Sequence, residues 1–111
     1  MSVPMDDGLE ACLECHRICL ETVSYLSTSE HPVGVEDIRL LFNTAEVCRM
    51  SAGLLRGSVA THGNAYAACA ELCEQSARYC DRRSEDLRLR ACAAACRRCA
   101  AACRGLAALA A

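Results

Sequence analysis

The sequence predicts an all-α protein, an antiparallel up-down-up-down four-helix bundle with a cysteine-lined core. Three observations lead to this fold class. Proline occurs only twice in 111 residues, and the composition is rich in alanine, which favours helices. Hydrophobic residues make up 53% of the chain but aromatic residues only 4%, which indicates a core of small and aliphatic side chains. Cysteines recur at spacings of three and four residues, which places them on one face of a helix.

The first two helices are separated by the polar turn STSEHPVG, in which proline and glycine stop a helix. The helix before this turn is expected to cover residues 6–27, with Asp6 or Asp7 as its N-cap. The helix after it is expected to cover residues 35–55 and to stop near a glycine.

The third helix is expected over residues 61–81, with Thr61 or Asn64 as a possible cap. The fourth is expected over residues 84–109, because Ser84 is followed by acidic residues that suit a first helical turn. Each helix is then about 20 residues and ~30 Å long. Because the connections are short, neighbouring helices should be antiparallel. The length suits a single domain that spans residues 1–111.

The cysteine spacing is strictest in the segment ACAAACRRCAAAC of the fourth helix. The third helix repeats this spacing in CAELCEQSARYC, with a serine in place of one cysteine. Every cysteine of the chain falls on the inward stripe of its helix, where other bundles carry leucine or isoleucine. These candidate metal ligands are Cys12, Cys15, Cys19, Cys48, Cys69, Cys73, Cys80, Cys92, Cys96, Cys99 and Cys103.

The number and placement of the cysteines argue against a disulfide scaffold. Eleven is an odd number, so at least one thiol would be left unpaired. The first residues, MSVPMDDGLEA, do not resemble a signal peptide. A reducing cytoplasm, in which the thiols stay free to bind metal, is therefore expected.

Stacking the antiparallel helices at about 1.5 Å per residue predicts which thiols are neighbours. The result is a column of thiols along the bundle axis, not a single site. The expected levels are Cys19 with Cys92; Cys15 with Cys48, Cys73 and Cys96; and Cys12 with Cys69 and Cys99, with Cys80 and Cys103 at the two ends.

Soft thiolates select Cu(I), Zn(II) or iron–sulfur clusters. A straight helix stripe cannot wrap an iron–sulfur cluster, which normally uses loop cysteines. Zinc needs closed sets of about four ligands, whereas Cu(I) accepts about two or three thiolates and suits a continuous column. The geometry therefore favours several Cu(I) ions, with a zinc or mixed-metal thiolate protein as the alternative.

His62 begins the stripe of the third helix and is a candidate ligand at an entrance to the column. Met5 and Met50 could be soft ligands at an entrance, but both are more simply interpreted as filler. His16 and His31 are interpreted as surface residues.

Four segments resemble the cysteine-rich four-helix-bundle copper storage proteins of bacteria. They are CLECHRIC, TAEVCRMSAGLLRGS, CAELCEQSARYC and ACAAACRRCAAACRGL, and together they cover most of the chain. The resemblance implies thiolates that hold many Cu(I) ions, a cytosolic location and often a homo-oligomer, commonly a tetramer. It also implies that His62, and less surely Met5, stand where copper enters.

The chain departs from the cysteine pattern of that family at three stripe positions, which are Thr44, Tyr66 and Ser76. Fewer Cu(I) ions than in a fully cysteine-lined relative are therefore expected. The sparser part of the column should be sealed by Leu26, Ile38 and Leu41.

The leading hypothesis is a non-catalytic store or buffer of Cu(I). A metal-free helical scaffold or interaction protein is a further alternative, in which the cysteines are small core residues. An enzyme is not expected, because no His, Asp or Ser set accompanies a reactive cysteine. The net charge of −2 gives no reason to expect nucleic acid as a partner, and no apolar run is long enough to span a membrane.

Overall fold

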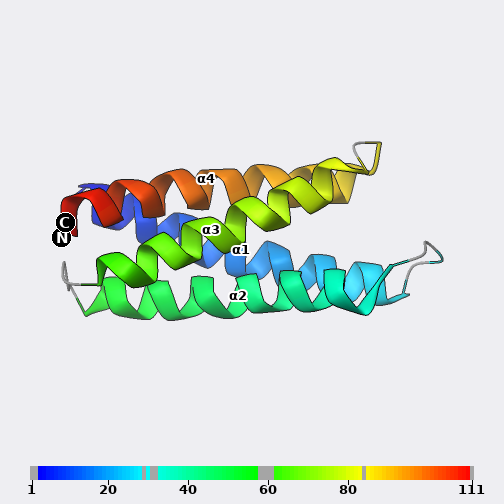
Figure 1. Cartoon of the computed structure of the whole chain (residues 1–111), viewed down its shortest axis with the longest axis horizontal. Coiled ribbons are helices and arrows are strands. Elements are labelled where there is room, and N and C mark those ends of the chain that lie inside the picture. Colours follow the sequence, from blue (N-terminus) through cyan, green and yellow to red (C-terminus); the bar gives the residue numbers. More distant parts are fainter. Residues whose placement is uncertain (1–2, 29, 31–32, 58–61, 84, 111) are drawn as a thin grey trace.

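The computed structural model describes residues 3–28, 30, 33–57, 62–83 and 85–110. These residues form an elongated bundle of four helices that measures 43 × 19 × 18 Å (Figure 1), and the described residues contain no strand. The helices are α1 (Val3–Thr28), α2 (Val35–Arg56), α3 (Gly63–Asp81) and α4 (Leu87–Ala110).

Consecutive helices run in opposite directions, so the predicted up-down-up-down bundle is confirmed (Figure 1). α1 packs against α2 and α4, and α3 packs against the same two helices. The pairs α1–α3 and α2–α4 therefore face each other across the core. We call the end where α1 begins and α4 ends the terminal end, and the opposite end the distal end.

Two helix starts differ from the predictions. α1 already begins at Val3, so Asp6 and Asp7 lie inside the helix and the prediction of an N-cap there was wrong. For α4, the cap is Asp86, whose Oδ1 accepts the backbone N–H groups of the second and third helical residues at 2.9 and 3.3 Å. This carboxylate satisfies two of the backbone donors that a helix start leaves free. Ser84, the predicted cap, lies outside the described residues.

α3 begins without a side-chain cap. His62 occupies the N-cap position and makes no capping hydrogen bond with its side chain, whereas its carbonyl oxygen accepts the backbone N–H groups of Ala65 and Tyr66 at 3.0 and 3.2 Å. Asn64 lies within the helix, so the prediction that it caps α3 was wrong. Thr61, the other predicted cap, lies outside the described residues.

Small side chains flank the cysteines on the inner faces of α3 and α4. Ala70 and Ala77 on α3, and Ala93 and Ala100 on α4, are at most 2% exposed. Because the distance between packed helices depends on the side chains at the contact, alanine allows these two helices to approach closely. Thiols of these two neighbouring helices, such as Cys69 and Cys103, are thereby brought close together.

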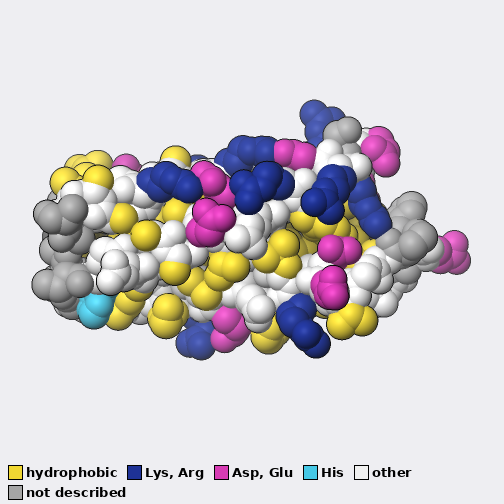
Figure 2. All heavy atoms as spheres, in the orientation of Figure 1, with side chains coloured by type: hydrophobic (Ala, Val, Ile, Leu, Met, Phe, Trp, Pro, Cys, Tyr) yellow, Lys and Arg dark blue, Asp and Glu magenta, His cyan; other side chains and the backbone are white. Residues whose placement is uncertain are grey.

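Arginines on the outer face of the bundle pair with acidic residues of the neighbouring helices. Arg97 of α4 pairs with Asp81 of α3, and Arg98 of α4 pairs with Glu14 of α1. Figure 2 shows basic and acidic side chains side by side over α4 and α3. These pairs are about half exposed, so each adds only about 0–1 kcal/mol to stability.

Leucines continue the cysteine stripes toward the distal end. Leu26, Leu41 and Leu89 are at most 3% exposed, which confirms the predicted burial of the first two. Ile38, the third residue expected to seal this end, is only partly buried. At the same end, Tyr25 donates a hydrogen bond of 2.8 Å to Asp86 and links α1 to the start of α4.

Replacing Leu41 with alanine should destabilise the metal-free protein by about 2–5 kcal/mol, because it leaves a cavity in a fully buried position. The measurement is chemical unfolding of the reduced protein followed by circular dichroism. Phe42 is the matched control, since this neighbouring side chain is 46% exposed, and its replacement should cost less than about 1 kcal/mol. Equal losses for the two variants would contradict the burial described above.

Candidate metal centre

All eleven cysteines are free thiols, and each is 0% exposed. The prediction that every cysteine points inward is therefore confirmed. Each thiol is held by the helical spacing of its stripe, so its position is fixed by the packing of the bundle and not by a loop. A core of this kind offers many soft ligands and excludes water from them.

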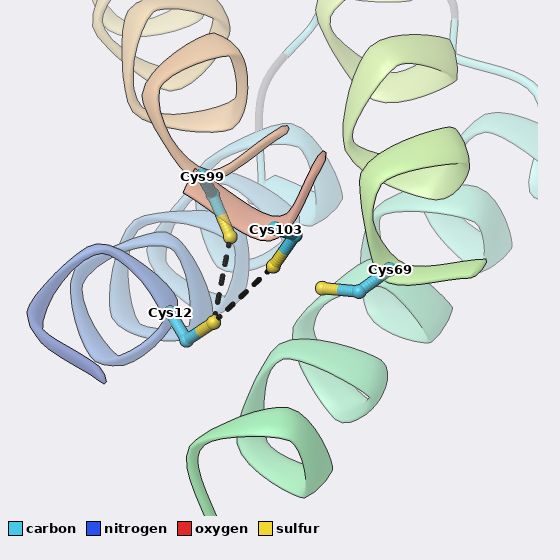
Figure 3. Close-up of side chains that lie close together, drawn as sticks. All are labelled: Cys12, Cys69, Cys99 and Cys103. Carbon is cyan, nitrogen blue, oxygen red and sulfur yellow. Dashed lines mark hydrogen bonds between the residues drawn. The ribbon is translucent and has the colours of Figure 1, made fainter. Parts of the chain in front are cut away.

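The first group of thiols lies toward the terminal end and consists of Cys12, Cys69, Cys99 and Cys103. Their sulfur atoms all lie within 4.8 Å of one another. Cys12 Sγ is 3.7 Å from the sulfurs of both Cys99 and Cys103. Figure 3 shows the four side chains of α1, α3 and α4 converging on a common point. Four sulfurs at this spacing could hold a metal ion without a large movement of the helices.

The second group lies further along the axis and consists of Cys15, Cys48, Cys73 and Cys99, again within 4.8 Å of one another. One thiol comes from each helix. Cys48 Sγ is 3.7 Å from Cys73 Sγ and 3.8 Å from Cys99 Sγ. Each of the four helices therefore contributes one sulfur to this group.

A third group of three thiols, Cys15, Cys19 and Cys96, continues the column on the α1 and α4 side. Cys96 Sγ is 3.7 Å from the sulfurs of both Cys15 and Cys19. Cys99 belongs to the first and second groups, and Cys15 to the second and third. Because neighbouring groups share a thiol, they form one continuous column, as the sequence predicted.

The column is thinner toward the distal end. Cys92 Sγ lies 4.0 Å from Cys19 Sγ, as predicted from the helix levels. Cys80 has Cys92 as its thiol neighbour, and the hydrogen bond with Cys92, together with burial, raises the pKa of Cys80. Neither Cys80 nor Cys92 belongs to the three groups, which were found among the described residues.

Two of the three positions where the cysteine pattern is broken form a hydroxyl pair. Thr44 and Ser76 are both 0% exposed, and their oxygens lie 2.8 Å apart. The Thr44 hydroxyl donates to the carbonyl oxygen of Leu40 at 2.9 Å. The bond between the two hydroxyls gives each of them a partner. Both groups are thus satisfied inside the core, as buried hydroxyls require.

Tyr66, the third break, is 1% exposed. Burial and the nearby thiols of Cys103 and Cys12 raise the pKa of its hydroxyl. Tyr66 is therefore close to the first group of thiols, which contains both of these cysteines. Ser51 lies on the same stripe as Cys48 and is fully buried, and among the described residues its hydroxyl oxygen has no hydrogen-bond partner. The stripe position of Ser51 is visible in the sequence, but the lack of a hydrogen-bond partner depends on the packing of neighbouring helices.

The thiols do not all favour the same protonation state. Hydrogen bonds with Cys19 and other surrounding thiols lower the pKa of Cys15, and hydrogen bonds with Cys103 and its neighbours lower the pKa of Cys69. Hydrogen bonds with Cys103 and Cys12 lower the pKa of Cys99 to about 6. Hydrogen bonds with neighbouring thiols favour the charged form at these positions and offset the cost of burying it.

Other thiols of the column have raised pKa values, which favour the protonated form. Hydrogen bonds with Cys15 and other thiols, together with burial, raise the pKa values of Cys19 and Cys48. Hydrogen bonds with Cys12 and its neighbours, together with burial, raise the pKa of Cys103. A metal ion that binds Cys19, Cys48 or Cys103 must therefore displace protons.

The histidines are not part of the thiol groups. His62 is partly buried and lies outside all three groups, so its role at an entrance stays a prediction. His16 was expected on the surface, but this was wrong: it is partly buried, and its Nδ1 lies 2.8 Å from the carbonyl oxygen of Ala45 on α2. It follows the core position Cys15 directly, on the flank where α1 meets α2. His31 lies outside the described residues.

The two methionines considered from the sequence differ in burial. Met5 is partly buried and packs against the core. Met50 is 48% exposed, so it is a surface residue, and its interpretation as core filler was wrong.

The sequence model of the family described as "Csp: Copper storage protein" matches residues 2–108. The chain belongs to the copper storage protein family. The crystal structure of the Nmul_A1745 protein from Nitrosospira multiformis is similar, with a TM-score of 0.86 and 28% sequence identity. The match covers 98% of this chain and 99% of that one. No curated protein matches the chain.

The resemblance stated from the cysteine segments is thus confirmed at the level of the family. A copper storage family is a family of storage proteins and not of enzymes, and the buried thiol groups are compatible with metal binding. Among the described residues, none of the helices is long and apolar enough to pass through a bilayer.

Proposed function

We propose that this member of the copper storage family stores or buffers several Cu(I) ions in the thiol column of its core. The ligands are the eleven cysteines, within a single domain that spans residues 1–111. The protein acts without catalysis, by exchanging Cu(I) between thiolates, in the cytoplasm. His62 is the candidate ligand at the terminal end of the bundle, where copper enters.

One observation carries this proposal: the thiol groups share members and form an unbroken column. Cys99 links the first two groups and Cys15 links the second and third. Sulfur–sulfur distances of 3.7–3.9 Å run from Cys12 through to Cys96. Because Cu(I) accepts about two or three thiolates, ions can occupy adjacent positions that share bridging sulfurs.

Zinc is the second candidate, since two of the groups contain four thiols, the number that a closed zinc site uses. The two groups share Cys99. Zinc could therefore fill both only with Cys99 as a bridge, and most of the remaining thiols would stay without metal. This sharing is a reason to favour Cu(I) over Zn(II).

The test is a Cu(I) titration of the reduced protein under anaerobic conditions, in competition with a strong Cu(I) chelator. More than about four ions per chain are expected, because about two or three thiolates serve each ion and can be shared. The control is a variant in which Cys92, Cys96, Cys99 and Cys103 are all alanine, which should bind far fewer ions. Saturation of the native protein at one ion or none would end the proposal.

Co(II) substitution separates the zinc alternative from the copper proposal. Strong tetrahedral thiolate absorption at about two Co(II) ions per chain, combined with weak Cu(I) retention, would favour zinc.

The proposal also includes a homo-oligomer, with a tetramer possible. Light scattering after size-exclusion chromatography measures the mass of the assembly. A monomer at all concentrations would remove this part and leave the storage proposal intact.

A further inference from the structure

The hydroxyl pair formed by Thr44 and Ser76 lies on two cysteine stripes. Thr44 is one helical turn from Cys48 on α2, and Ser76 lies between Cys73 and Cys80 on α3. Both hydroxyl residues are as fully buried as the cysteines around them. They therefore occupy positions in the column where thiols would otherwise stand.

Sulfur contacts differ on the two sides of this pair. On the terminal side, the sulfurs of Cys48 and Cys73 are 3.7 Å apart, and both residues belong to the second group of thiols. On the distal side, Cys80 is in none of the thiol groups, and its thiol neighbour is Cys92. Along α2 and α3 the chain of sulfurs thus stops at the hydroxyl pair, whereas along α1 and α4 it continues through Cys19 and Cys92.

The two hydroxyl groups are poorly suited to bind Cu(I). A hydroxyl oxygen is a hard ligand, and Cu(I) prefers soft sulfur. The two oxygens also hydrogen-bond to each other and to the backbone of α2. A copper ion would have to break these bonds at a fully buried position, where a hydroxyl that loses its partner is costly.

We propose that the Thr44–Ser76 pair sets the capacity of the column: it interrupts the sulfur path along α2 and α3 and keeps Cys80 apart from the larger thiol groups. This inference rests on the proposed function, since it concerns Cu(I) storage in the same column. It identifies two residues that determine how many ions fit, without themselves binding any.

The test replaces both residues with cysteine, as Thr44→Cys with Ser76→Cys. The matched control is Asn43→Cys with Gln75→Cys, which places two thiols on the same helices, one residue earlier, at exposed positions. Anaerobic Cu(I) titration against a strong chelator should show about one or two more ions per chain for the buried pair. The exposed pair should bind no additional ion that the chelator cannot remove.

A second variant separates added thiols from lost hydroxyls. Thr44→Val with Ser76→Ala removes the hydrogen bonds and supplies no sulfur, so its capacity should equal that of the native protein. Ser76→Cys alone serves if the double cysteine variant does not fold, and it should gain up to about one ion. Circular dichroism of each metal-free variant establishes that the bundle is intact.

The inference is overturned if the native protein takes up several Cu(I) ions and folded Thr44→Cys, Ser76→Cys protein takes up the same number. An equal gain in the exposed control would also overturn it, because position in the core would then be irrelevant. Failure of the native protein to bind more than one ion is a different result: it removes the proposed function, and this inference falls with it.

Discussion

Replacing Cys99 with serine should lower the number of Cu(I) ions bound at saturation more than replacing Cys80 with serine. Cys99 belongs to two groups of four thiols, whereas Cys80 belongs to none. If bridging sulfurs hold adjacent ions, loss of Cys99 weakens the sites on both sides of it. The expected losses are about two ions for Cys99→Ser and about one or none for Cys80→Ser.

The two variants are matched, because both cysteines are fully buried and both substitutions replace sulfur with oxygen at the same position. Copper content is measured after saturation under anaerobic conditions and removal of weakly bound ions by a chelator. Circular dichroism of the metal-free proteins checks that each bundle is intact. Equal losses would show that the ions are held by separate, independent sites, and the shared column would then be wrong.

Copper affinity should rise with pH across the neutral range. The pKa values of Cys19, Cys48 and Cys103 are raised by hydrogen bonds with neighbouring thiols and by burial, so these groups carry protons at neutral pH. A Cu(I) ion must displace those protons, and they compete more strongly as the pH falls. An ion that displaces two protons should lose about a hundredfold in apparent affinity per pH unit.

Cys99 should behave differently, since hydrogen bonds with Cys103 and Cys12 lower its pKa to about 6. Its thiolate is available above that pH, and protons begin to compete for it only as the pH falls through about 6. The measurement is Cu(I) competition with a chelator from pH 5.5 to 8, together with proton release on loading at pH 7.5. No proton release at pH 7.5 would contradict the raised pKa values of Cys19, Cys48 and Cys103.

Much of the fold could be predicted because the cysteine stripe and the helix composition agree. Spacings of three and four residues fix which face of each helix points inward, whatever the partner helix is. The polar turns then leave only an antiparallel arrangement of neighbours. For this reason the sequence predicts that Cys19 lies level with Cys92 and Cys15 level with Cys96, and both pairs are in contact in the structure.

The helix starts were harder to predict, because several acidic and hydroxyl residues near each start are chemically able to cap it. Asp86 caps α4, and this could not be predicted because only the folded turn brings its carboxylate to the free N–H groups of Arg88 and Leu89. His16 is a similar case. Its burial depends on the carbonyl of Ala45 on another helix, which no spacing within α1 reveals.

Helical periodicity sets the direction of each side chain, so the spacing of the cysteines alone places eleven thiols inside four helices. The exact groups that these thiols form could not be predicted in this way. Distances between helices depend on how neighbouring side chains pack, and that packing makes Cys99 and Cys15 shared members of the thiol groups. The same packing joins Thr44 to Ser76 and leaves Cys80 beside Cys92 at the distal end.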